Sequence, residues 1–135
     1  MPLSIKEVKI LEVPKITDVR GNLSIVEEGF LPFEIKRVYY LYDVPSDAYR
    51  GGHAHKQQFE FLVALSGSFN VLLSDSKGEK KTYTLYKPNQ GLLIPNRVWR
   101  ELNNFSSGSV CLVIASDVFM ESDYIRDPKD FFSTE

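Results

Sequence analysis

Short runs of β-branched and aromatic residues, separated by turn-forming residues at hairpin spacing, are the feature that most constrains how this chain can fold. The sequences SGS, SKG and SSG are typical of the tight turns that join neighbouring strands. About nine or ten short strands in one chain predict an all-β sandwich or small barrel. The predicted strands cover residues 5–13, 22–28, 35–44, 59–65, 69–75, 81–86, 92–94, 99–103 and 110–115.

The composition agrees with this prediction and bounds the size of the fold. The chain has 135 residues, among them seven Tyr and nine Phe, which favour strands. This length suits one hydrophobic core, so we expect a single domain over residues 1–135. Residues 47–52, which end in two glycines, are predicted as a loop. Only residues 121–130 have the pattern of a helix, a short one ended by Pro128.

Charge and hydropathy exclude several classes of protein. The formal net charge is -2, and no basic block of the kind that binds nucleic acid is present. The first residues alternate apolar and polar, unlike a signal peptide, and no window is apolar enough to cross a membrane. The one cysteine, Cys111, lies in an apolar run and is predicted to be a buried thiol. We therefore expect a cytoplasmic protein.

The two histidines of the chain form a His-Ala-His tripeptide, His53 and His55. Residues at positions i and i+2 of a strand point to the same face, so the two rings project side by side, into a barrel or to solvent. Glu60 and Gly67 follow at the spacing of the first conserved motif of the cupin superfamily. The segment resembles that motif, and chance surface histidines are the less favoured alternative.

The second cupin motif bears on whether a metal is bound. In the segment GLLIPNRVWRELNN, Pro95 and Asn104 stand where the motif has Pro and Asn, but Arg100 occupies the place of its histidine ligand. A guanidinium stays protonated and cannot coordinate a cation. His53, His55 and Glu60 could still form a facial triad for iron, but a positive charge beside it opposes this. We predict no metal.

Two histidines without a metal suit proton transfer, since imidazole titrates near neutrality. Tyr39 lies in the run RVYYLYDV and shares a strand face with Arg37. Most such tyrosines pack in a core, but a phenol in a polar cavity can relay a proton between two oxygens.

The segments IKRVYYLYDV, RGGHAHK, LSGS, VWRE, FSSGSVCLVIASD and ESDYIRD together resemble the sugar 3,4-ketoisomerases, small WxcM-like cupins. The resemblance implies a cupin jelly roll of antiparallel strands, and a homodimer that exchanges an N-terminal strand. It also implies catalysis without a metal or cofactor. The implied substrate is a dTDP-linked 4-keto-6-deoxyhexose, dTDP-4-keto-6-deoxyglucose, and the implied pathways lead to 3-amino-3,6-dideoxyhexoses.

The resemblance also implies roles for individual residues. His53 would be the base that moves hydrogen between C3 and C4, Tyr39 would lie near the C3 and C4 oxygens, and His55 would assist or orient. Arg37 and Arg50 would meet the diphosphate, where forked cations pair well with phosphate oxygens. The implied substrate-binding residues are Arg20, Arg37, Arg50, Arg100 and Asn103.

Two of these arginines bear on the configuration at C4 of the product. In the family, Arg at the position of Arg20 accompanies the galacto product, and Arg at the position of Arg100 accompanies the gluco product. This chain has Arg at both positions, so the C4 configuration stays open.

Three other functions remain as alternatives. A nucleotide-sugar 3,5-epimerase uses related acid-base chemistry on a related barrel. A metal-dependent cupin oxygenase would need a bound transition metal. A sugar-binding module without activity would bind the same nucleotide sugar and leave its carbonyl group in place.

Overall fold

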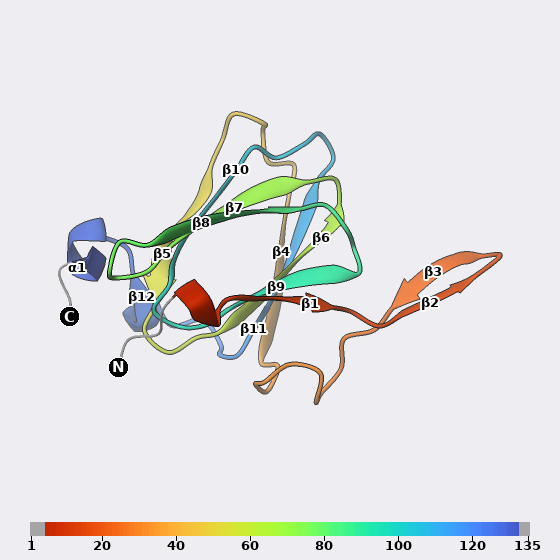
Figure 1. Cartoon of the computed structure of the whole chain (residues 1–135), viewed down its shortest axis with the longest axis horizontal. Helices are drawn as coiled ribbons and strands as arrows, with labels where there is room; N and C mark the ends of the chain where they lie inside the picture. The colour runs from red at the N-terminus through yellow and green to blue at the C-terminus, as the bar shows by residue number, and fades with distance from the viewer. Residues whose placement is uncertain (1–4, 133–135) are drawn as a thin grey trace.

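Two antiparallel five-stranded sheets form the body of the protein (Figure 1). The computed structural model describes residues 5–132. One sheet has the strand order β1-β9-β6-β11-β4, and the other has the order β12-β5-β10-β7-β8. Strands that are neighbours in space are mostly distant in sequence, as in a jelly roll. The expected all-β fold of antiparallel strands with a short C-terminal helix is confirmed.

The element bounds are close to those predicted in the centre of the chain and differ towards its ends. The strands are β1 (Lys9–Glu12), β2 (Lys15–Asp18), β3 (Gly21–Ser24), β4 (Arg37–Tyr42), β5 (Arg50–His55), β6 (Glu60–Ser66), β7 (Phe69–Ser74), β8 (Lys80–Leu85), β9 (Gln90–Ile94), β10 (Trp99–Asn103), β11 (Val110–Ala115) and β12 (Tyr124–Ile125). The helical elements are the 3-10 turns η1 (Ile5–Glu7) and η2 (Glu121–Asp123), and the helix α1 (Pro128–Phe132).

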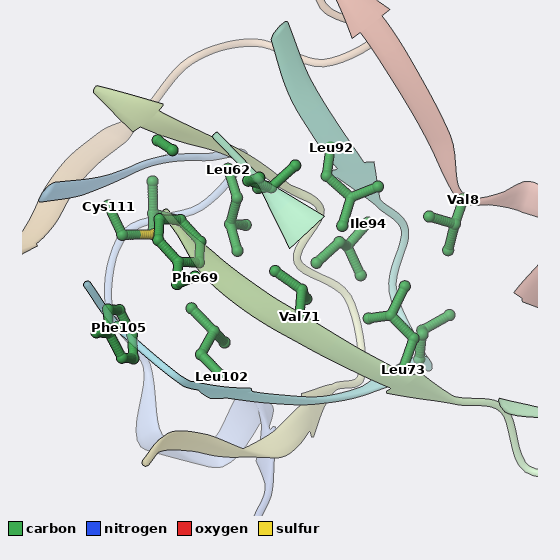
Figure 2. Packing of buried hydrophobic residues seen from close by; sticks show 14 of the residues in the cluster. Val8, Leu62, Phe69, Val71, Leu73, Leu92, Ile94, Leu102, Phe105 and Cys111 are labelled. Atoms are coloured by element: carbon green, nitrogen blue, oxygen red, sulfur yellow. The ribbon is translucent and has the colours of Figure 1, made fainter. Parts of the chain in front are cut away.

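The main hydrophobic core lies between the two sheets. Along β7 every second residue is buried, as expected for a strand with one face on a core. These side chains meet residues of the other sheet, including Leu62, Leu92 and Cys111 (Figure 2). Phe69 and Phe105 stack with ring centroids 5.2 Å apart. The Cys111 thiol is buried, as predicted.

A second cluster covers the outer face of the sheet that contains β6. Phe61 and Val63 of β6 pack there against the segment between β3 and β4. The ring of Phe30, from that segment, meets the ring of Phe61 edge to face with centroids 6.0 Å apart. Strand β6 is therefore buried on both faces and holds Glu60, its first residue, rigidly.

Two segments differ from their prediction. The predicted loop over residues 47–52 is instead partly strand, because β5 begins at Arg50 and pairs with β10. The short C-terminal helix is present, but its predicted bounds, residues 121–130, are wrong. The 3-10 turn η2 and the short strand β12 occupy its first half, and the α-helix begins at Pro128 rather than ending there. Proline suits the first turn of a helix, where its missing N–H is not needed.

The hairpin formed by β2 and β3 was not predicted as a pair, and it projects away from both sheets (Figure 1). All eight of its strand residues are exposed, including the apolar residues Ile16 and Leu23. No helix within residues 5–132 is long and apolar enough to span a membrane.

A close approach of two strands makes Gly91 necessary. A Cβ atom at Gly91 of β9 would overlap the ring of Phe61 on β6. We expect Gly91→Ala to lower the free energy of unfolding by about 1–3 kcal/mol, since the core would be overpacked. Urea denaturation measures this change. Phe61→Leu should make room, so the double variant should lose less than the two single losses combined; simple additivity would contradict this account.

Candidate active site

A polar cavity of about 430 Å³ opens between the sheets, next to the apolar core. Strands β4, β5, β6 and β10 line it, together with the C-terminal segment that contains β12. A pocket of this size with a few convergent polar groups is the usual setting of a small-molecule site. The residues that line the cavity are Arg37, Tyr39, Leu41, Tyr49, Arg50, Gly51, His53, Glu60, Leu62, Arg100, Leu102, Val113, Tyr124 and Arg126.

Because side chains alternate between the two faces of a strand, every second residue of β4 points into the cavity. Arg37, Tyr39 and Leu41 of β4 are partly buried and line the cavity, while the residues between them are exposed. The guanidinium carbon of Arg37 lies 5.1 Å from the centroid of the Tyr39 ring. The inner face of β4 therefore offers a cation and a phenol next to each other.

Two glycines and a bulge shape strand β5 just before His53. Gly51 and Gly52 have φ of +85° and +74°, a conformation that residues with a side chain rarely adopt. A Cβ at Gly51 would come within 3.0 Å of the backbone oxygen of Arg100, so the two strands approach closely there. The pairing of β5 with β10 shifts register at this point, between Arg100 and Glu101. Such bulges often re-aim side chains near active sites.

Glu60 is the centre of a buried hydrogen-bond network. Its Oε1 accepts a hydrogen bond from Arg100 Nη1 at 2.6 Å. Its Oε2 accepts one from the Tyr39 hydroxyl at 2.8 Å and one from Gln58 Nε2 at 2.8 Å. Arg100 also donates to the backbone oxygen of Val98 at 3.0 Å. Both charged groups are almost completely buried, so each is the partner that compensates for the removal of the other's charge from water.

This network sets the protonation states of Glu60 and Tyr39. Burial alone would raise the pKa of the Glu60 carboxyl, but the charge of Arg100 and the hydrogen bond from Tyr39 hold it well below its usual range. Burial raises the pKa of Tyr39 far above its usual value, and the negative charge of Glu60 adds to this. Glu60 is therefore a carboxylate, and Tyr39 is a neutral phenol that donates to it.

His53 lines the cavity as a neutral base. Its Nε2 is buried and has no hydrogen-bond partner among residues 5–132. Burial lowers the pKa of His53 from 6.5 to about 3, and the positive charge of Arg100 acts in the same direction. An unprotonated and unpaired imidazole nitrogen in a cavity can take a proton from a bound molecule.

His55 lies behind His53 and does not line the cavity. The two rings meet edge to face with centroids 4.9 Å apart, so they project from one face of β5, as the spacing predicts, and this face is turned inward. His55 is fully buried. Its Nδ1 lies 3.0 Å from Asp123 Oδ2, and its Nε2 lies 3.5 Å from Gln58 Nε2 and 3.5 Å from Glu60 Oε2.

The C-terminal segment closes one side of the site. Strand β12 pairs with β5, which places Tyr124 opposite His55 and Ile125 opposite Ala54. The centroid of the Tyr124 ring lies 4.9 Å from that of His53 and 4.4 Å from that of His55. Arg126 also lies against Tyr124, with its guanidinium carbon 4.2 Å from the ring centroid. The SDYIRD segment thus packs directly against both histidines.

One group of described residues has the ligand types of a metal site. The ligand atoms of His53, His55 and Glu60 lie within 4.8 Å of one another. However, Glu60 already accepts hydrogen bonds on both oxygens, and one donor is the guanidinium of Arg100. A divalent cation would have to displace these donors and lie beside a fixed positive charge. This donor set does not fit a resident metal.

The structure brings most of the predicted site residues together, but not all of them. His53, Tyr39, Arg37, Arg50 and Arg100 line the cavity. Two predicted substrate-binding residues do not line it. Asn103 lies at the end of β10, on the face opposite to Arg100 and Leu102. Arg20 lies at the tip of the β2–β3 hairpin, where its side chain is 86% exposed and pairs with Asp18.

Several residues of the site were not assigned a role from the sequence. They are Gln58, Tyr49, Asp123, Tyr124 and Arg126. Asp123, Tyr124 and Arg126 belong to the ESDYIRD segment. The resemblance of this segment to the sugar 3,4-ketoisomerases was the sequence signal that could have identified them.

Comparisons with known proteins agree with this geometry. Residues 6–135 match the family model described as FdtA: WxcM-like, C-terminal. A TDP-4-oxo-6-deoxy-alpha-D-glucose-3,4-oxoisomerase from Aneurinibacillus thermoaerophilus is 44% identical over 93% of this chain and 90% of its own length.

Two solved structures are also similar. A mutant of the 3,4-ketoisomerase QdtA from Thermoanaerobacterium thermosaccharolyticum, in complex with TDP-4-keto-6-deoxyglucose, has a TM-score of 0.91 at 37% identity over 95% of this chain and 93% of that one. The WlaRB TDP-quinovose 3,4-ketoisomerase from Campylobacter jejuni has a TM-score of 0.91 at 42% identity over 96% of this chain and 100% of that one.

The lowered pKa of His53 predicts how stability depends on pH. Between pH 6.5 and about 3, the unfolded chain binds a proton at this ring and the folded protein does not. The free energy of unfolding should therefore fall as the pH is lowered from about 8 to about 5, and fall less in His53→Gln. Urea denaturation at several pH values measures both slopes. Glu60 titrates below this range, and equal slopes in the two proteins would contradict the assignment.

Proposed function

The chain belongs to the FdtA family of WxcM-like proteins and is a sugar 3,4-ketoisomerase, and we propose that it moves the carbonyl group of TDP-4-keto-6-deoxyglucose from C4 to C3. The observation that carries this proposal is the buried, unpaired Nε2 of His53 in the cavity. The reaction needs a base that is free at neutral pH, and the pKa of His53 meets this need.

In the proposed reaction, His53 takes the hydrogen on C3 as a proton. That hydrogen is acidic because the C4 carbonyl lies next to it, and the electrons left behind form an enediolate across C3 and C4. His53 then returns the proton to C4. C3 is oxidised and C4 is reduced within one sugar, so no redox cofactor takes part. Arg100 lines the cavity and supplies positive charge towards the enediolate.

A second proton must move from the C3 oxygen to the C4 oxygen. Tyr39 lines the cavity, and its hydroxyl proton points to Glu60 Oε2. The phenol oxygen can therefore accept the proton of the C3 hydroxyl while its own proton shifts towards Glu60. The low pKa of Glu60 favours the return of that proton, through Tyr39, to the C4 oxygen.

The diphosphate would bind at the mouth of the cavity. Arg37 and Arg50 line it, as the sequence led us to expect, and Arg126 lines it as well. Guanidinium groups pair with phosphate oxygens through two parallel hydrogen bonds. The configuration at C4 of the product is not assigned, because Arg20 and Arg100 are both present.

The alternatives fit these contacts less well. The guanidinium of Arg100 on Glu60 disfavours a metal-dependent oxygenase. A 3,5-epimerase would need a base placed at C5, and a binding module would not need a buried neutral imidazole.

We also propose a cytoplasmic enzyme, because a single unpaired cysteine is typical of a reducing compartment.

We further propose that the enzyme is a homodimer in which the β2–β3 hairpin lies on a second copy of the chain. An isolated two-stranded hairpin is marginally stable in water, yet this one exposes Ile16, Val19 and Leu23. A partner surface would cover these side chains. Arg20 at the hairpin tip would then enter the cavity of the partner, which accounts for its distance from the cavity of its own chain.

Incubation of the protein with TDP-4-keto-6-deoxyglucose tests the reaction. We expect NMR spectra to show the carbonyl carbon moving from C4 to C3. His53→Asn should lower kcat by about 10²–10⁴-fold, because the base is lost, while TDP still binds.

Each alternative has its own outcome in this experiment. Deuterium at C5 would indicate an epimerase, and an unchanged sugar would indicate a binding module. A wild-type rate in His53→Asn would show that another group is the base. The spectrum of the product also gives the configuration at C4.

Mixing Arg20→Ala, which lacks a predicted substrate-binding side chain, with His53→Asn, which lacks the base, tests whether Arg20 acts in the partner subunit. If it does, a mixed dimer of Arg20→Ala and His53→Asn chains contains one intact cavity. We expect the mixture to regain activity, up to about a quarter of the wild-type sites after free exchange of subunits. A mixture that is no more active than its two components would contradict the proposal, as would a monomer in sedimentation equilibrium.

A further inference from the structure

We propose that Asp123 is a positioning residue that fixes the ring tautomer of His55 and thereby orders the hydrogen bonds around Glu60. This inference rests on the proposed isomerase activity, but it concerns a residue that lies outside the cavity lining. Asp123 is the last residue of η2 and directly precedes β12, so it belongs to the C-terminal segment that closes the site.

The two carboxylate oxygens of Asp123 hold different groups. Oδ1 accepts a hydrogen bond from the backbone N–H of Gln57 at 2.7 Å. Oδ2 lies 3.0 Å from His55 Nδ1 and accepts a longer bond from the backbone N–H of Gln58 at 3.4 Å. Asp123 therefore ties the C-terminal segment to the end of β5 and to one histidine ring.

The contact with Asp123 decides which nitrogen of His55 carries hydrogen. A carboxylate can only accept hydrogen bonds, so His55 Nδ1 must donate to Oδ2. In the neutral ring, Nε2 is then left as an acceptor. Two groups lie 3.5 Å from this nitrogen: Gln58 Nε2, which can donate a hydrogen bond to it, and Glu60 Oε2, which cannot.

The side-chain amide of Gln58 links the protonation of His55 to the hydrogen bonds of Glu60. Gln58 Nε2 has two hydrogens, of which one serves Glu60 Oε2 at 2.8 Å and the other faces His55. Gln58 Oε1 accepts from Arg37 Nη2 at 3.3 Å, which fixes the orientation of the amide. Glu60 Oε2 is also the acceptor of the Tyr39 hydroxyl. One consistent set of donors and acceptors thus runs from Asp123 to Tyr39.

Asp123→Asn would exchange the donor and acceptor roles between residue 123 and His55 Nδ1. The amide oxygen should stay with the N–H of Gln57, the shorter of the backbone bonds, because that donor cannot change. The NH2 group would then face His55 Nδ1, and the ring must accept there and carry its hydrogen on Nε2. That hydrogen would oppose the Gln58 amide and compete with Tyr39 for Glu60 Oε2.

We expect Asp123→Asn to slow the chemical step and to leave substrate binding nearly unchanged. We expect Asp123→Asn to lower kcat by about 10- to 100-fold, less than loss of the base itself, while KM changes by less than about threefold. Asp127→Asn is the matched control. It lies in the same segment, its carboxylate accepts the backbone N–H of Lys129 at 2.9 Å, and it should behave like the wild type.

Nitrogen-15 NMR of the His55 ring provides a readout that does not depend on activity. We expect the wild type and Asp127→Asn to carry hydrogen on Nδ1, and Asp123→Asn to carry it on Nε2. If the wild type does not move the carbonyl group, the proposed function fails, and the ring signals still test the role of Asp123.

A double variant shows whether Asp123 acts through His55. In a His55→Asn background, single-turnover measurements should find little further loss from Asp123→Asn. Three results would overturn the proposal: unchanged His55 ring signals in Asp123→Asn, an equal loss of rate in both backgrounds, or a lower melting temperature with kcat unchanged.

Discussion

The buried pair of Glu60 and Arg100, joined at 2.6 Å, is the interaction on which the rest of the site depends. Two charges removed from water are tolerated only when each faces the other and their remaining hydrogen-bonding capacity is used. The second oxygen of Glu60 meets this condition by accepting from Tyr39 and Gln58. The charge of Arg100, after burial itself, lowers the pKa of His53. The same guanidinium therefore makes the site unsuited to a metal and keeps the base free.

The C-terminal segment forms the part of the active site that the two sheets leave open. It runs past the ends of the sheets and returns to pair with β5, so that Tyr124 packs on both histidine rings. Arg126 lies over the ring of this tyrosine and forms an ion pair with Glu121 at 2.6 Å. A few residues of the C-terminal segment thus form one wall of the cavity beside the base.

The sequence predicts local features well and long-range contacts poorly. Strands β10 and β11 have the predicted bounds, because period-two alternation and the flanking turn residues are local signals. The i, i+2 spacing of His53 and His55 correctly predicts rings on one face. The contact between Asp123 and His55 joins residues 68 positions apart, and no local pattern encodes it. Arg20 is exposed because it lies at the tip of a hairpin that projects away from both sheets (Figure 1).

The central claim is that His53 is a neutral base with a free nitrogen in the cavity. Nitrogen-15 NMR of the His53 ring in the TDP complex, followed from about pH 8 down to about pH 5, tests it most directly. We predict a ring that stays neutral throughout this range, with one nitrogen that carries no hydrogen. A ring that becomes an imidazolium near pH 6.5, its ordinary value, would contradict the claim.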